Sequence, residues 1–139
     1  MCDAVRFCHY SGVKVYVTLN TLVFDREIPL LAKVIENCAK ADVDAFIVQD
    51  MGVARLSRQI VPELPLHAST QMTVNSPEGA IMAKELGFTR VVLGRELSFA
   101  QIKAITESCD IETELFVHGA LCVCISGQCY MSSVLLSLI

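Results

Sequence analysis

Ala45-Phe46-Ile47-Val48-Gln49-Asp50 is an apolar run of four residues followed directly by two polar side chains. Such a run predicts a short strand that is buried on both faces, as strands are in parallel sheets. Similar runs recur along the chain, at residues 15–19, 66–68, 90–93 and 112–117. Segments with helical periodicity separate them, and this alternation predicts βα units around a parallel sheet.

Several of the intervening helices carry recognisable start signals. Asp25 can cap a helix in which Ile28, Leu31, Ile35 and Cys38 follow a 3.6-residue period. Two further helix starts are predicted, one at Ser76 before Pro77 and one at Ser98, which forms a capping box with Gln101. Helices of this kind between buried strands complete the α/β pattern.

The length of the chain limits how much of such a fold it can form. A complete eight-stranded TIM barrel needs about 250 residues, whereas this chain has 139. We therefore expect residues 1–139 to form a single α/β domain, a partial TIM-like barrel of about five βα units. The high apolar content of 53% suits strands that are buried on both faces.

The net charge and the hydropathy of the chain limit the binding partners and the cellular compartment that we expect. The net charge of −4 gives no broad basic face, so bulk electrostatics do not favour nucleic-acid binding, although a local groove could supply it. No apolar run is long enough to span a bilayer, and the N-terminus lacks the pattern of a secretory signal. We expect a cytoplasmic protein whose seven cysteines are reduced thiols or metal ligands.

Polar side chains follow each predicted strand, where barrel enzymes carry their chemistry. We expect them to share one rim, with Asn20, Gln49 and Asp50 binding substrate and with His67, Gln71, Arg95, Glu96 and His118 in catalytic roles. Arg95 could grip a carboxylate or phosphate while Glu96 holds it or acts as a base, but the two could equally form a local ion pair. His118 could orient a ligand or pair with a thiol, or be a buried histidine bonded to backbone.

The richest cluster of reactive groups lies near the end of the chain. Cys129 follows Cys122 by seven positions, and Gly119 and Gly127 allow the tight turns that would bring the two thiols together. Thiolates suit zinc and iron–sulfur centres, and both usually need four ligands. The alternative is a set of ordinary buried cysteines in an apolar segment.

The pattern Glu-x-Phe-x-x-Gly-Ala-Leu-Cys, four residues, then Gly-x-Cys-x-Met-Ser occupies residues 114–132. It resembles the signature of peptidase family U32, the collagenase-like peptidases, and residues 14–21, 44–50, 66–72 and 90–97 resemble further blocks of that family in the same order. Members normally begin with a further strand and helix and continue beyond residue 132 with more cysteines. We therefore expect a truncated fragment of the family's N-terminal domain, without its first strand and its C-terminal portion.

The resemblance also implies a cofactor and a reaction. Cys122 and Cys129 match cysteines that hold a four-iron–four-sulfur cluster in members that hydroxylate RNA bases or a quinone precursor without molecular oxygen, with prephenate as an oxygen donor. The other two ligands of such relatives lie downstream. Cys124 is then a spare thiol by default, or a substitute ligand. The implied activity is thus oxygen-independent hydroxylation of RNA, with a quinone precursor as the variant substrate, and we expect the fragment alone to be inactive.

Two alternatives from other functional classes stand beside it. One is a collagenase-like peptidase acting on a peptide, although the chain has neither a His-Glu-x-x-His helix nor a Gly-x-Ser-x-Gly elbow. The other is an inactive piece of a barrel. An incomplete barrel leaves sheet edges unpaired, so we also expect self-association through those edges.

Overall fold

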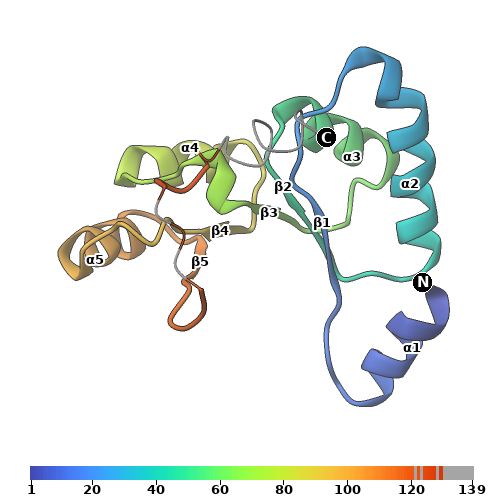
Figure 1. Ribbon diagram of the computed structural model, residues 1–139, viewed down its shortest axis with the longest axis horizontal. Coiled ribbons are helices and arrows are strands. Elements are labelled where there is room, and N and C mark those ends of the chain that lie inside the picture. Colours follow the sequence, from blue (N-terminus) through green and yellow to red (C-terminus); the bar gives the residue numbers. More distant parts are fainter. Residues whose placement is uncertain (121, 123, 128, 130–139) are drawn as a thin grey trace, which may run out of the picture.

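The computed structural model describes residues 1–120, 122, 124–127 and 129. Five strands form one parallel sheet in the order β1-β2-β3-β4-β5 (Figure 1). Their bounds are β1 Tyr16–Leu19, β2 Ala45–Val48, β3 Leu66–Ala68, β4 Arg90–Val92 and β5 Glu112–Glu114. The predicted α/β alternation is confirmed, and each strand pairs with its neighbour in sequence, as in a (β/α) barrel.

Five helices accompany the sheet: α1 Cys2–Tyr10, α2 Ile28–Lys40, α3 Met51–Ile60, α4 Pro77–Glu85 and α5 Phe99–Ser108. Two 3₁₀ turns, η1 Asp25–Glu27 and η2 Thr70–Met72, precede α2 and follow β3. Figure 1 shows α2 on the side of β1, and α4 and α5 at the opposite end of the sheet. None of the helices in the described part of the chain is long and apolar enough to cross a lipid bilayer.

The predicted helix caps are confirmed at two positions and wrong at one. The Ser76 hydroxyl accepts a hydrogen bond from the backbone N–H of Gly79, and Ser98 forms the predicted box with Gln101. Asp25 caps no helix, because it is the first residue of η1 and α2 begins three residues later. The carboxylate that accepts a backbone N–H at this turn belongs to Glu27, whose Oε2 lies 2.9 Å from the nitrogen of Phe24.

The two faces of the sheet differ in composition. One packs against the helices through fully buried residues, among them Phe46, Val48, Leu66 and Val91. The other carries the registered row Ile47, His67, Arg90 and Glu112, and there Arg90 pairs with Glu112 at 2.7 Å and with Glu114 at 3.0 Å. In a barrel, this second face is the one that turns toward the axis.

The fifth strand is shorter than predicted. It ends at Glu114 rather than at residue 117, because its ladder with β4 ends where Val92 pairs with Glu114. Phe116 and Val117 are consequently exposed, at 62% and 96%. The apolar residues after Glu114 therefore belong to a surface loop that leads into the cysteine-rich segment.

Candidate functional site

Three cysteine thiols converge in the segment that follows β5. The sulfur atoms of Cys122, Cys124 and Cys129 all lie within 4.8 Å of one another. Cys122 and Cys129 are exposed, and Cys124 is half-buried. We call the described residues 122, 124–127 and 129 the cysteine loop. The third thiol, Cys124, was expected to be a spare cysteine or a substitute ligand, and its place in the group agrees with the second of these readings.

Arg95 and Glu96, which follow β4, bind this loop. The guanidinium of Arg95 donates to the carbonyl oxygen of Cys122 at 3.3 Å and to that of Cys124 at 3.5 Å. The Glu96 carboxylate accepts from Ser126 twice, from the hydroxyl at 2.9 Å and from the backbone N–H at 3.3 Å. Both side chains therefore have a structural task at the loop. The Arg95 charge also helps to lower the pKa of Glu96, although the two form no ion pair among the described residues.

The loop also rests on the segment that follows β3. Gly127 has a φ of +83°, and a Cβ atom there would lie 2.8 Å from Oγ1 of Thr73 and 2.9 Å from the carbonyl oxygen of Gln71. Thr73 Oγ1 donates to the carbonyl of Ser126 at 3.4 Å. Only glycine combines this backbone conformation with so close an approach. The carboxyl ends of β3, β4 and β5 thus meet at one place.

The surroundings shift the acidity of the groups at this site. A hydrogen bond from the backbone of Cys124 is the main cause that lowers the pKa of the Cys122 thiol, with Cys129 and Arg95 adding to it. The pKa of Cys124 is raised, mainly by its hydrogen bond with Cys129. Desolvation raises the pKa of Glu96, but hydrogen bonds from its own backbone and from Ser126 outweigh it, so the net shift is downward. Of these two thiols, Cys122 is accordingly the one more ready to act as a thiolate.

We expect the Glu96→Gln variant to loosen the cysteine loop, because a neutral amide is a weaker acceptor for Ser126 than a carboxylate. A carboxylate whose pKa is lowered in the folded state stabilises that state above its unfolded pKa, and the effect is lost as the pH falls through the folded pKa. Hydrogen exchange of residues 122 and 124–127 should be faster in the variant at pH 7, and the difference should shrink only as the pH falls below the ordinary carboxyl pKa of 4.5, since the folded pKa of Glu96 is lowered from that value. Glu63→Gln, on an exposed site, is the control; an equal effect there would contradict the assignment.

The other residues expected at the rim lie less close to one another than Arg95 and Glu96 lie to the cysteine loop. Asn20 and Gln49 follow Leu19 and Val48, which are register partners, so both lie at the carboxyl end of the sheet and are half-buried. The side chain of Gln71 is exposed, and its backbone supports Gly127. His118 is exposed beside a separate hollow of about 380 Å³. Their substrate-binding and catalytic roles stay predictions.

His67 does not join that rim. It is the middle residue of β3, is 4% exposed, and lines a cavity of about 230 Å³ together with Lys14, Asp44 and Thr89, which precede β1, β2 and β4. Its ring contacts Tyr16 edge-on at 4.8 Å between centroids. Burial, and then the charge of Arg90, lower the pKa of His67, so the ring is neutral at pH 7. The expected rim position is wrong, because a mid-strand side chain projects roughly perpendicular to the sheet, and here it enters a cavity lined by residues that precede the strands.

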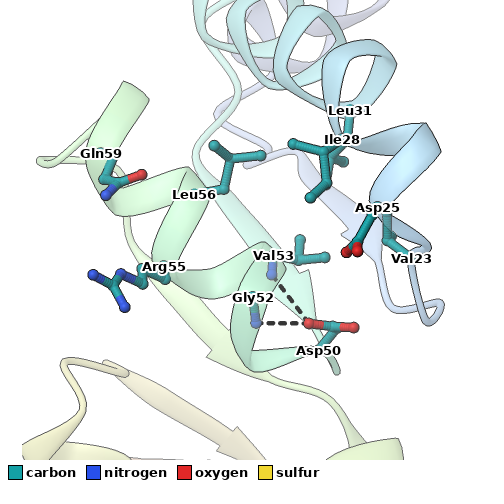
Figure 2. A pocket seen from close by; sticks show the side chains of 10 residues that line it. All are labelled: Val23, Asp25, Ile28, Leu31, Asp50, Gly52, Val53, Arg55, Leu56 and Gln59. Atoms are coloured by element: carbon teal, nitrogen blue, oxygen red, sulfur yellow. Dashed lines mark hydrogen bonds between the residues drawn. The ribbon is translucent and has the colours of Figure 1, made fainter.

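Asp50 lies in a cleft between helices α2 and α3 (Figure 2). The cleft has a volume of about 390 Å³ and apolar walls that include Ile28 and Leu31 of α2 and Val53 and Leu56 of α3. Figure 2 shows the carboxylate of Asp50 hydrogen-bonded to the first turn of α3. Its Oδ1 accepts the N–H groups of Gly52 at 2.6 Å and Val53 at 3.2 Å. Asp50 is therefore a helix cap, whatever else it binds.

We expect Asp50→Ala to lower the free energy of unfolding by about 1 kcal/mol, the usual effect of removing a side-chain N-cap. Asp25→Ala is a matched control, because Asp25 lines the same cleft but caps neither η1 nor α2. Chemical denaturation should show a loss for the first variant and little change for the second. Equal losses would mean that the charge of the cleft, and not the cap, stabilises the fold.

Comparison with known proteins shows which proteins the chain resembles. A family model described as peptidase family U32 matches residues 1–137. The chain is 45% identical over 130 residues to a 23S rRNA 5-hydroxycytidine synthase of Escherichia coli, covering 94% of this chain and 19% of that protein. It is 36% identical over 132 residues to a tRNA hydroxylation protein of Helicobacter pylori, covering 94% of this chain and 31% of the relative.

Other matches carry a different activity in their names. A protein named collagenase from Porphyromonas gingivalis is 34% identical over 136 residues, covering 90% of this chain and 32% of that protein. A solved structure of a U32 peptidase superposes with a TM-score of 0.69 at 20% identity, covering 82% of this chain and 49% of the other. That likeness shows a shared fold. The chain spans less than a third of the length of these three sequence relatives.

Proposed function

This chain belongs to peptidase family U32, and from that premise we propose that its protein hydroxylates RNA without molecular oxygen, using an iron–sulfur cluster. The observation that carries the proposal is the convergence of the Cys122 and Cys129 thiols at the carboxyl end of the sheet. In a barrel, this is the end at which reactions take place. The similarity to proteins named for rRNA and tRNA hydroxylation favours RNA over a quinone precursor.

The residues present suit such a cofactor. Iron–sulfur clusters are held by cysteine thiolates, and the pKa of Cys122 is lowered by the backbone hydrogen bond from Cys124. Cys122 and Cys129 would supply two of the four ligands. When bound, the cluster would supply electron transfer, and prephenate is the proposed oxygen donor. Arg95 and Glu96 would hold the ligand-bearing loop in place through the Cys122 and Cys124 carbonyls and Ser126.

The loop after β5 also offers a surface for an RNA base. Phe116 is 62% exposed, and His118 is exposed two residues later, close in sequence to Cys122. Proteins recognise unpaired RNA bases largely by stacking them on aromatic rings, a contact that does not require a strongly basic surface. This aromatic pair is compatible with the chain's net charge of −4, and Asn20 and Gln49 would contact neighbouring groups of the substrate.

Nucleoside mass spectrometry tests the proposal. RNA from cells with and without the gene is digested, and the two sets of nucleosides are compared. We expect one nucleoside to carry an additional oxygen atom only when the gene is present, and to regain it on complementation. An unchanged set of nucleosides, together with cleavage of a collagen peptide by the purified protein, would contradict hydroxylation and favour the peptidase.

The peptidase remains a second candidate on one specific observation. Cys122 has a lowered pKa and is exposed, as a cysteine nucleophile must be, and the chain is similar to a protein named collagenase.

Under either proposal we expect the 139-residue chain to be inactive alone and cytoplasmic. We also expect it to self-associate, because β1 and β5 each have one unpaired edge in the described sheet.

A further inference from the structure

One buried polar atom near the cysteine loop has no hydrogen-bond partner among the described residues. This atom is Oδ1 of Asn75, a residue in the segment between η2 and α4. An unpaired buried oxygen has lost its bonds to water without gaining a substitute, and such atoms are rare in folded proteins. Asn75 is therefore a candidate for a specific contact.

The side-chain amide of Asn75 lies opposite the carboxylate of Glu96. A Cβ atom added to Gly94 would stand 3.0 Å from Oδ1 of Asn75 and 2.8 Å from Oε1 of Glu96, so the two oxygens approach the same point from different segments. Two facing acceptors repel one another, whereas the NH₂ group of the same amide can donate to a carboxylate. Oε1 can accept such a bond, because its contact with the backbone N–H of Ser126 is a long one of 3.3 Å.

We propose that Asn75 is a positioning residue of the cysteine loop, and that its side-chain NH₂ group donates a hydrogen bond to Oε1 of Glu96. Rotation of the amide exchanges the places of its oxygen and its NH₂ group, so the contact needs no movement of the backbone. It would fix the carboxylate that binds Ser126, and through Ser126 the loop that carries Cys122 and Cys129. The inference deepens the proposed function, because the importance of a fixed loop for a cluster rests on that proposal.

The backbone on both sides of Asn75 is held in place. Thr73 adopts a left-handed conformation with a φ of 56°, which is unfavourable for a β-branched residue, and its Oγ1 donates to the carbonyl of Ser126 at 3.4 Å. On the other side, the hydroxyl of Ser76 caps α4 by accepting the N–H of Gly79 at 3.1 Å. A side chain that extends from so fixed a segment loses little conformational freedom when it forms one more bond.

Gly94 is the residue that allows the two side chains to meet. Its backbone is outside the left-handed region, so alanine can adopt the same conformation. A Cβ atom there would nevertheless come within 3.0 Å of both the Asn75 amide and the Glu96 carboxylate. Gly94→Ala should therefore push these two groups apart and loosen the loop, while leaving the path of the backbone unchanged.

Amide hydrogen exchange of residues 122 and 124–127 measures how firmly the loop is held. The 139-residue chain, shown by circular dichroism to be folded, is compared with its variants at pH 7. Asn75→Asp should speed this exchange on the order of ten-fold, because a second carboxylate replaces the donor. Gly94→Ala should act in the same direction. Asn37→Asp, the same change at an exposed position of α2, should exchange as the parent chain does.

Exchanging the two groups tests the contact itself. In the double variant Asn75→Asp/Glu96→Gln, the amide at position 96 can donate to the carboxylate at position 75 while its oxygen still accepts from Ser126. We expect the double variant to exchange more slowly than Asn75→Asp, although Glu96→Gln alone loosens the loop. A double variant as fast as Asn75→Asp, or parent rates in Asn75→Asp or Gly94→Ala, would overturn the contact. So would equal acceleration of the amides of β2, which would indicate a general loss of stability.

A second measurement connects the contact to the cluster. In the cluster-loaded protein, Asn75→Asp retains Cys122 and Cys129, yet it should lose the cluster absorbance in air about 10-fold faster than the parent, and the double variant should lose it more slowly than Asn75→Asp. Equal rates in all three would refute a positioning role at the cluster. The exchange experiment contains neither iron nor RNA, so a protein that takes up no cluster would contradict the proposed function and leave the exchange result unaffected.

Discussion

Cys122→Ser and Cys129→Ser should each abolish RNA hydroxylation and cluster absorbance together in the cluster-loaded protein. Each replacement exchanges a thiolate ligand for a hydroxyl, which stays protonated at neutral pH and is a poor ligand for iron. Since the described loop supplies only part of a four-ligand shell, losing either thiol leaves the cluster open to solvent and oxidation. Iron and sulfide analysis, visible absorbance and nucleoside mass spectrometry on the same preparations measure the two losses.

The choice of control follows from the burial of the other cysteines. Cys38 is fully buried in α2, so a serine there would leave a hydroxyl in the core and lower stability for unrelated reasons. Cys2 is exposed, and Cys2→Ser should retain both absorbance and activity. Cys124→Ser should keep the cluster, because Cys124 is not one of the two expected ligands. Full iron content in Cys122→Ser and Cys129→Ser, with loss of peptide cleavage, would contradict the hydroxylase and support the peptidase.

Phe46→Ala should lower the free energy of unfolding by about 3–5 kcal/mol, the usual range for removing a buried phenylalanine. Phe46 is fully buried in β2, which pairs with β1 on one side and β3 on the other. Alanine would leave a cavity that the flanking strands cannot close without breaking their register. Such a loss is a large fraction of the total stability of about 5–15 kcal/mol that is typical of a domain.

Phe99→Ala provides the matched comparison, since it removes the same side chain from a residue that is 92% exposed. We expect a change within about 0.5 kcal/mol for this surface position. Urea denaturation followed by circular dichroism measures both variants. Similar losses in the two would mean that the helix-covered face of the sheet is not the core that stabilises this chain.

Local sequence signals predicted most of the fold because they depend on near neighbours. The apolar run at residues 45–48 became β2 unchanged, and the Ser98–Gln101 capping box formed as its spacing required. The fifth strand was predicted too long because its end depends on where β4 stops, which periodicity within one segment does not reveal. Helix α1 was not predicted either.

The site depended more on contacts between distant residues. Glu96 and Ser126 are thirty positions apart, so nothing near either residue indicates that they are bonded. The turn at Ser126-Gly127 is visible in the sequence, but the surface against which it packs is not. Cys124 illustrates the same limit, because its membership of the thiol group follows from the path of the loop and not from its spacing to Cys122. The position of His67 could not be predicted either, because it depends on which three residues form β3.

The strand order affects how the protein can fold while the ribosome synthesises it. Each of the strands β2 to β5 pairs with the strand made immediately before it, so each of these βα units finds its partner already synthesised. Pairings between near neighbours in sequence close short loops, which favours rapid folding. Synthesis at about 5–20 residues per second is slow compared with such steps. The sheet can therefore grow from β1 to β5 during translation, and the loop that carries the three thiols follows β5 and folds onto a surface that is already in place.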